Sequence, residues 1–460
     1  MALTALKNHT DGDQLFDDQE AYEHYCLKLI EEKAAGLTSI DDIAAKEADL
    51  NVYPHIDCLE KPRNVYLVDD NALSDTDRQR AAACILEGRL FSEHAAAGEA
   101  TRLGLGSKYL LNIHQDLSEA QIATLISQET STPVTPSDVR DIARHSPRDI
   151  EPLSLGARHM LQFSFDIHNL AMSLGKNPEQ ALLRQKMLII LNQQSAAAIL
   201  SEIQRFKYFG FSWKNVYFMI QQSFYGINLK HGQFFFDPSS PTRLHNHGQI
   251  VIQQTMRNQI FTLDPLGEHH IVNKDEFHGT LATMEDKVAY NIENLDFLTG
   301  SIDYAALAFA LKQGDKGTQM IMEIVGNDPV YPQKGGMAAY DPILKKNVMI
   351  EGFQLKGLEN KDIYYLNKNF NHYPHPAESW LTVKQHGLNM PITVKEGYLY
   401  FQPVQGDINF LVKTDFFSRK QKTAISSLKS PYNLPAAILK MAEQDKHPGF
   451  IDYAREMQAY

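Results

Sequence analysis

Two short, fully apolar segments constrain the fold of this chain more than any other feature. Met187–Leu191 and Val216–Ile220 each contain five consecutive apolar residues, and the helix-like segment Ala196–Phe206 lies between them. Runs of this length are typical of strands that are buried on both faces of a parallel sheet. A strand, a crossover helix and a second buried strand form the repeating unit of such sheets. The sequence therefore predicts a mainly parallel α/β domain.

Periodicity and turn signals predict the other elements. Helices are expected at Gln19–Lys33, Ser39–Lys46, Asp75–Leu90, Gly156–Ser173 and, in two pieces, Leu117–Arg144. Ser39, with Asp42 three residues later, forms a capping box at the start of the second helix. Strands are expected at Gln249–Thr255, Lys287–Asn291, Gln319–Val325, Asn347–Phe353, Asp362–Leu366, Tyr398–Phe401 and Ile408–Lys413. These elements predict a helical N-terminal appendage over 1–80, an α/β domain over 81–390 and a β-rich C-terminal extension over 391–460.

Composition excludes several classes of protein. The 460 residues include 44 Lys and Arg against 56 Asp and Glu, a net charge of −12, without a basic run. Such a chain is a poor nucleic-acid binder, because phosphate backbones require clustered basic residues. Its apolar runs are far shorter than the roughly 20 residues of a membrane helix, and we find no signal peptide. Three separated cysteines, Cys26, Cys58 and Cys84, form neither a disulfide framework nor a zinc motif. We expect a cytoplasmic protein.

The segment from Ala95 to Lys108 carries the clearest local signal for chemistry. It is rich in small residues and contains Gly98, Thr101, Arg102 and Gly104. Small residues allow backbone N–H groups to approach a phosphate, and arginine and lysine can neutralise its charge. The order of glycine and lysine differs from that of a Walker A loop. A helix start packed closely on a strand is an alternative interpretation.

This segment resembles the signature of the eukaryotic nucleotide-sugar pyrophosphorylases, of the UDP-glucose and UDP-N-acetylhexosamine type. The signature reads Leu-x-Gly-Gly-x-Gly-Thr-Arg-Leu-Gly and is followed by a lysine. Gly98 and residues 101–104 match it, and Lys108 can stand for the lysine. Later segments are similar to further family motifs in the same order, at 187–192, 208–211, 216–222, 244–250, 291–295, 323–325, 334–336, 370–371 and 401–416.

The resemblance implies a Rossmann-like nucleotide-diphospho-sugar transferase domain with a mixed sheet. It implies that a nucleoside triphosphate, UTP above others, reacts with a sugar 1-phosphate in the presence of Mg²⁺ to give a nucleotide-sugar and pyrophosphate. Arg102 would then hold the β- and γ-phosphates, Lys108 the α-phosphate and Glu293 the metal. The other residues expected to contact the nucleotide or the sugar are Ala97, Gly98, Thr101, Gln222, His247, Gly248, Gly336, Glu351 and Asn371.

Several positions depart from the family pattern, and two alternatives stay open. Four of these departures favour the first alternative. Ala97 and Ala100 replace glycines, Glu293 replaces an aspartate, and Gln405 replaces a lysine that contacts phosphate in the family. One alternative is a non-catalytic descendant that binds a nucleotide or a nucleotide-sugar. The other is a transferase with a different, non-sugar acceptor.

Other patterns point less strongly to chemistry. The histidines at 245 and 247, and those at 269, 270 and 278, have spacings found in metal sites, but they lack cysteine partners or a His-Glu-x-x-His motif. We expect them at turns and strand ends. Arg158-His159 is expected to make surface or capping contacts rather than to act in catalysis. Asp296 could join Glu293 as a carboxylate pair for Mg²⁺.

Overall fold

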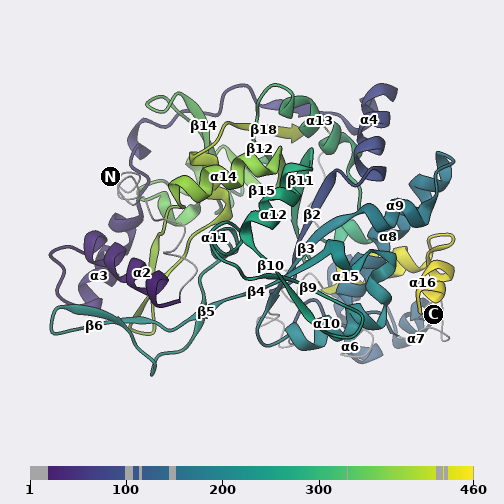
Figure 1. Ribbon diagram of the computed structural model, residues 1–460, viewed down its shortest axis with the longest axis horizontal. Helices are drawn as coiled ribbons and strands as arrows, with labels where there is room; N and C mark the ends of the chain where they lie inside the picture. Colours follow the sequence, from purple (N-terminus) through teal and green to yellow (C-terminus); the bar gives the residue numbers. More distant parts are fainter. Residues whose placement is uncertain are drawn as a thin grey trace.

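A large mixed sheet forms the centre of the molecule (Figure 1). The structure is a computed structural model that describes residues 19–98, 107–112, 117–143, 152–328, 330–420, 428 and 434–458. The strand order is β1-β18-β12-β15-β11-β2-β3-β4-β9-β10, and β13 and β14 join beside β15. The strands are β1 (Tyr66–Val68), β18 (Thr414–Arg419), β12 (Met320–Gly326), β15 (Tyr365–Pro374), β11 (Asp286–Asn291), β2 (Leu90–Ala95), β3 (Lys186–Asn192), β4 (Val216–Gln221), β9 (Ile260–Leu263), β10 (His269–Val272), β13 (Met337–Asp341) and β14 (Lys346–Ile350).

Four neighbouring strands at the centre of this sheet, β11, β2, β3 and β4, run parallel to one another. Alternate side chains of β3 enter two different hydrophobic cores. Met187, Ile189 and Leu191 belong to one core, whereas Leu188 and Ile190 belong to the other. Both faces of β3 are therefore buried, as its unbroken apolar sequence predicts.

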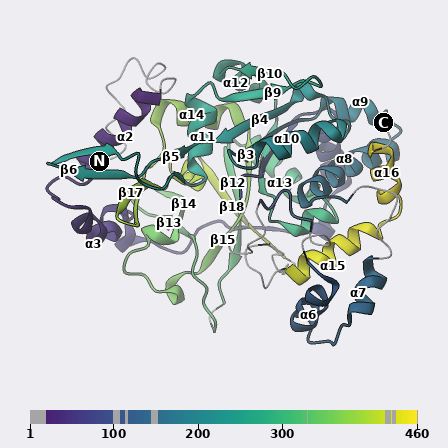
Figure 2. The ribbon, with the colours of Figure 1, turned by 90° about the horizontal axis from the view of Figure 1, so that it is seen from below.

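Helices cover both faces of the sheet (Figure 2). The helices of the first core are α4 (Asp75–Leu86), α8 (Leu155–Ser173), α9 (Pro178–Arg184), α10 (Ala196–Arg205), α13 (Tyr304–Gly314) and α16 (Phe450–Gln458). The helices of the second core are α2 (Gln19–Lys33), α11 (Gly248–Met256), α12 (Lys274–Ala282) and α14 (Pro376–His386). A separate cluster joins α6 (Glu119–Thr130), α7 (Pro136–Ala143) and α15 (Leu434–Asp445) at one end of the molecule.

A smaller sheet lies beside the N-terminal helices. Its strand order is β16-β17-β6-β7, with β16 at Ile392–Lys395, β17 at Tyr398–Phe401, β6 at Ile227–Lys230 and β7 at Gln233–Phe236. Helix α2 contacts β7, and α3 (Ile40–Asn51) contacts β16. The remaining pair, β5 (Ser223–Phe224) and β8 (Arg243–Leu244), forms a two-stranded ladder. Phe234–Phe236 and Tyr398–Phe401 are thus sheet residues, as their aromatic composition predicts.

The mixed α/β class, the helices near the N-terminus and the central strands are confirmed, and α2 has its predicted bounds of Gln19–Lys33. Ser39 caps α3 as predicted, because its side chain accepts a hydrogen bond from the Asp42 N–H.

The strand prediction for Gln249–Thr255 is wrong, because this segment forms helix α11. Every residue of α11 is buried, so its sequence shows neither the period of a helix nor that of a strand. Its glutamines find partners at helical spacing. Gln249 accepts from the Tyr22 hydroxyl, Gln253 accepts from the Gln222 N–H, and Gln254 donates to Glu93.

The strand prediction for Ile408–Lys413 is also wrong. Residues Gln405–Phe410 form a short 3-10 helix, and the Val412 N–H donates to the Ile408 carbonyl at 3.2 Å. Ile408 and Val412 enter the second core together from one face of this turn. Four-residue spacing of two apolar side chains explains the helical turn.

His245 is a buried, unpaired polar group between aromatic rings. Its ring stacks on Phe224 at 4.1 Å and meets the edge of Phe401 at 5.8 Å. Neither ring nitrogen has a hydrogen-bond partner among the described residues, and the side chain is fully buried. Burial lowers the pKa of His245 to about 3. It is therefore neutral in the folded protein and belongs to the core.

We expect His245→Phe to reduce the loss of stability at acid pH. The unfolded histidine takes up a proton below about pH 6.5, whereas the folded one does not until about pH 3. Stability is therefore lost as pH falls through this window, by about 1.4 kcal/mol per pH unit. Urea unfolding of His245→Phe between pH 6.5 and 4.5 should show a slope smaller by that amount. Exposed His386, changed to Gln, is the control and should leave the slope unchanged; an equal slope in His245→Phe would contradict the assignment.

Candidate active site

The carboxyl ends of the central parallel strands meet at one edge of the sheet, where ligands of α/β proteins commonly bind. β2 leads into Ala96–Gly98, β3 ends at Asn192, and β11 leads into Ile292 and Glu293. Asn192 Nδ2 donates to the Ala97 carbonyl at 2.8 Å. The backbone that follows β2 is thereby fixed beside β3.

Lys108 and Glu293 form an ion pair at this edge, although 185 residues separate them in the sequence. The Lys108 N–H donates to the Gly98 carbonyl at 3.2 Å, which holds the lysine against the end of β2. The two side chains are 11% and 12% exposed, so the pair is largely screened from water. The structure thus brings together the lysine and the carboxylate for which the sequence predicts phosphate and metal contacts.

The small-residue segment is described up to Gly98 and again from Ser107. Ala97 is buried, and a Cβ on Gly98 would first meet Lys108 Cδ, at 3.7 Å. Thr101 and Arg102 lie within 99–106, outside the described residues, and their contacts with the nucleotide stay predictions.

A buried carboxylate that the sequence analysis did not single out, Glu93, lies within β2 itself. Glu93 pairs with Lys287 Nζ at 2.6 Å. It also accepts hydrogen bonds from Gln254 Nε2 at 2.7 Å and from Gln405 Nε2 at 2.9 Å. Lys287 Nζ lies 3.6 Å from the centre of the Trp380 ring, a cation–π contact. We call Glu93, Lys287, Gln254, Gln405 and Trp380 the Glu93 cluster.

Burial sets the electrostatics of the Glu93 cluster. The Lys287 side chain is fully buried, and burial lowers its pKa to about 8, while the nearby Glu93 carboxylate acts in the opposite direction. Three of the six residues of Leu90–Ala95 are polar, so the sequence around Glu93 carries no signal that this glutamate is buried. Its partner, Lys287, lies 194 residues further on, so the pair could be found only from the strand pairing of β2 with β11.

Gln405 connects the Glu93 cluster to the turn that begins α11. The Gln405 N–H donates to His247 Nδ1 at 3.0 Å, and the Gly248 N–H donates to the Pro403 carbonyl at 2.8 Å. A Cβ on Gly248 would lie 2.5 Å from Val404 N. The two backbones therefore approach as closely as they do only because residue 248 is glycine. His247 and Gly248 are brought to the site, and both pack against the chain around Gln405.

Glu351 and Gly336 lie together near Gly406. A Cβ on Gly336 would be 3.5 Å from Glu351 Oε2, and a Cβ on Gly406 would be 3.6 Å from Glu351 Oε1. Burial raises the pKa of Asp407 well above its usual value, and the nearby Glu351 carboxylate adds to the shift. Asn371, on β15, is buried, and its Oδ1 has no hydrogen-bond partner within the described part of the chain. Asp407 is thus a carboxyl group that burial favours in its protonated form, and Asn371 is a buried acceptor without a partner among the described residues.

Gln222, which follows β4, is engaged within the protein. Its Oε1 accepts from Arg257 Nη1 at 2.9 Å, its Nε2 donates to Gln19 Oε1 at 2.5 Å, and its N–H donates to Gln253. The carboxamide that the resemblance assigns to the nucleotide base is thus hydrogen-bonded to the first residue of α2. A nucleotide base can bind the Gln222 carboxamide only after the hydrogen bond to Gln19 or to Arg257 is broken.

The side chains of Asp296 and Arg158 contact other parts of the molecule than the candidate active site. Asp296 lines a cavity of about 550 Å³ together with Asp303, Glu323 and Arg419. Arg158 is buried and pairs with Asp445 at 2.6 Å, so it holds α8 to α15 as a structural residue. Burial lowers the pKa of its neighbour His159 to about 3, as expected of a core histidine.

None of the helices in the described ranges is long and apolar enough to cross a membrane.

Comparison with known proteins relates the chain to one group of folds. No family model and no curated protein matches the sequence. The uridine diphosphate N-acetylglucosamine pyrophosphorylase of Trypanosoma brucei, solved with an inhibitor, has a TM-score of 0.56 and 13% identity, over 96% of this chain and 82% of that one. The UDP-glucose phosphorylase of the same organism has a TM-score of 0.55 and 12% identity, over 95% and 78%.

A third structure, a mutant UDP-glucose pyrophosphorylase from Leishmania major in complex with UDP-glucose, has a TM-score of 0.50 and 12% identity, over 90% of this chain and 78% of that one. The chain therefore has the fold of UDP-sugar pyrophosphorylases, which confirms the predicted fold class.

We expect Gly248→Ala to destabilise the protein, because the new methyl group overlaps the backbone of Pro403 and Val404. Overpacking of this kind costs about 1–3 kcal/mol. Gly279, in α12, is the matched control, since a Cβ there meets nothing within 4 Å. Gly279→Ala should be neutral or more stable by up to about 1 kcal/mol. Denaturant unfolding measures both variants, and equal stabilities would show that the close approach at Gly248 does not exist.

Proposed function

We propose that the protein is a nucleotidyltransferase that joins a nucleoside triphosphate to a sugar 1-phosphate. The observation that carries the proposal is the meeting of Lys108 and Glu293 at the carboxyl ends of β2 and β11, in a chain with the fold of UDP-sugar pyrophosphorylases. A cation for phosphate and a carboxylate for a metal are the groups that this reaction requires at one place.

The reaction needs little covalent chemistry from the protein. A phosphate oxygen of the sugar 1-phosphate attacks the α-phosphorus of the triphosphate. A bond forms between them, the α–β phosphoanhydride bond breaks, and pyrophosphate leaves with the electron pair. The protein must align two anions and neutralise the charge that develops between them. Lys108, held at the end of β2, is suited to the α-phosphate.

Glu293 fits a role in holding Mg²⁺. Mg²⁺ is commonly bound by one or two carboxylates together with substrate phosphates. The Glu293 carboxylate is 12% exposed and is bonded to the mobile ammonium group of Lys108, so it can be released when a phosphate draws the lysine away. Mg²⁺ would supply charge neutralisation and orientation at the α-phosphate. Asp296 is not assigned to it, because it lines a different cavity.

Residues near the Glu93 cluster are suited to the sugar. Asn371 offers a buried acceptor without a partner among the described residues, which a hydroxyl group can satisfy. Glu351 and Gly336, which lie close to each other, belong with Asn371 to the predicted sugar-binding set. We assign the base to Gln222 and Gly248, the triphosphate to Thr101 and Arg102, and the nucleotide backbone contacts to Ala97 and Gly98. UTP is the favoured nucleotide, through the resemblance.

A second candidate function is the binding of a nucleotide-sugar without catalysis. Gln405 favours it, because the resemblance expects a lysine there, and the Gln405 carboxamide instead donates to Glu93. The site has one cation fewer for a leaving pyrophosphate. A transferase with a non-sugar acceptor remains the third possibility.

We expect both Lys108 and Glu293 to affect UTP binding, because Lys108 exchanges Glu293 for a phosphate and Glu293 then binds Mg²⁺. Lys108→Gln should weaken UTP binding by about 1.5–3 kcal/mol, the value of a charge-assisted contact. Glu293→Gln should bind UTP equally well with and without Mg²⁺, whereas the wild type should require the metal for full affinity. Exposed Lys395, changed to Gln, is the control for loss of a positive charge. Equilibrium binding measures the four proteins; if Glu293→Gln keeps the Mg²⁺ dependence, the metal lies elsewhere.

Pyrophosphate release tests the reaction itself. The wild-type protein is supplied with UTP, Mg²⁺ and a panel of sugar 1-phosphates. We expect release that depends on one of these acceptors. Binding of UDP-sugars without any release would instead support the non-catalytic candidate. Release that requires a different acceptor would support the third possibility.

A further inference from the structure

A β-hairpin near the amino end of β4, on the side of the sheet away from the candidate active site, carries three side chains of types that bind metals. Strands β9 and β10 pair antiparallel, with Thr262 opposite His270. Asp264 follows Thr262 by two residues, and Glu268 precedes His270 by two. Because strand side chains alternate between faces, Asp264, Glu268 and His270 all project on one face of the hairpin. His269, on the other face, stacks on Phe261 instead.

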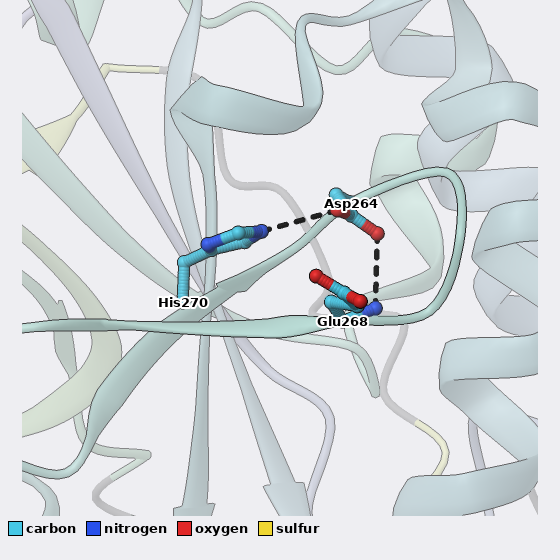
Figure 3. A group of neighbouring side chains, drawn as sticks. All are labelled: Asp264, Glu268 and His270. Carbon is cyan, nitrogen blue, oxygen red and sulfur yellow. Dashed lines mark hydrogen bonds and ion pairs between the residues drawn. The ribbon is translucent and has the colours of Figure 1, made fainter.

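The three side chains converge (Figure 3). One ligand atom from each, two carboxylate oxygens and an imidazole nitrogen, lies within 4.8 Å of the other two. Asp264 Oδ1 accepts from the N–H groups of Leu266 and Glu268, at 2.8 and 2.9 Å, so the turn itself fixes this carboxylate. Its Oδ2 faces His270 Nε2 at 3.2 Å.

The Glu268 carboxylate makes no hydrogen bond or ion pair within the described part of the chain. The cluster therefore carries two acidic groups for a single histidine. A divalent cation among these three groups would offset their charge.

We propose that Asp264, Glu268 and His270 bind a divalent transition-metal cation of the Zn²⁺ or Co²⁺ kind. A mixed set of carboxylate oxygens and one imidazole nitrogen suits these ions, whereas Mg²⁺ prefers oxygen ligands alone. Three protein ligands leave room for water in the remaining positions. The site does not depend on the proposed transferase activity, because β9 pairs with β4 so that Asp264 lies beyond the amino end of β4.

Neighbouring side chains hold the hairpin in this shape, as outer contacts do in metal sites. The Tyr208 hydroxyl donates to the carbonyls of Leu263 and Asp264, at 2.7 and 3.1 Å. Gln204 Nε2 donates to the Asp264 carbonyl at 3.1 Å. The His270 ring packs against Trp213 with centroids 5.4 Å apart. Trp213 is one of two tryptophans in the chain, so it reports on the occupancy of the site.

Quenching of Trp213 fluorescence by Co²⁺ tests the proposal on the full-length protein. We expect saturable quenching that an equal concentration of Zn²⁺ reverses and the same concentration of Mg²⁺ does not. Trp213→Phe should abolish the quenching, because the other tryptophan, Trp380, is buried in the Glu93 cluster. Displacement of Co²⁺ by Mg²⁺ at equal concentration, or quenching that persists in Trp213→Phe, would overturn the assignment.

Variants of the ligands decide which groups bind. Glu268→Gln and His270→Gln should each weaken Co²⁺ binding at least tenfold. Asp264→Asn keeps an oxygen acceptor for the turn but loses the charge, and should also weaken binding. His269→Gln, on the other face of the hairpin, is the matched control and should bind Co²⁺ normally. Melting without metal verifies the fold of each variant. Unchanged affinity in both Glu268→Gln and His270→Gln would overturn the proposal.

Discussion

The parallel pairing of β11, β2, β3 and β4, each packed between two cores, is the constraint on which the rest of the molecule depends. Residues that follow these strands are far apart in the sequence, but a parallel ladder places all four carboxyl ends at one edge. Lys108 reaches Glu293 only because β2 and β11 are neighbours in register. The pairing of these strands therefore determines where charged chemistry can occur, and β2 and β11 themselves contribute the buried pair Glu93–Lys287.

The Glu93 cluster shows how the central sheet is joined to the elements that pack on its second-core face. A buried ion pair gains little in net stability, because both charges are desolvated, but removal of one partner costs about 3–5 kcal/mol. Glu93 satisfies its remaining acceptors with Gln254 and Gln405, so the cluster ties β2 to α11 and to the segment after β17. Gln405 in turn fixes the His247 turn. An interaction in the core thus sets the position of backbone segments at the candidate active site.

Sequence reasoning succeeded where a pattern had one physical explanation. Unbroken apolar runs identified β3 and β4, the capping serine identified α3, and the ordered motifs indicated the fold. It failed at Gln249–Thr255, where complete burial removes periodicity, and at Ile408–Lys413, where two apolar residues indicate a turn as well as a strand. The meeting of Glu93 with Lys287, and of Gln222 with Gln19, could not be predicted, because each pair depends on long-range packing. Thr101 and Arg102 belong to the part of the site that the sequence alone addresses.

The hydrogen bond between Gln19 and Gln222 has a consequence for the N-terminal helix. Helix α2 also buries Tyr22, Cys26 and Ile30 in the second core, so its apolar side is covered by the rest of the chain. A chain that begins after Lys33 would leave the apolar side of the small sheet open to water. Such a shortened protein would be prone to associate through that surface, and its poor recovery would reflect colloidal behaviour rather than a loss of catalytic groups.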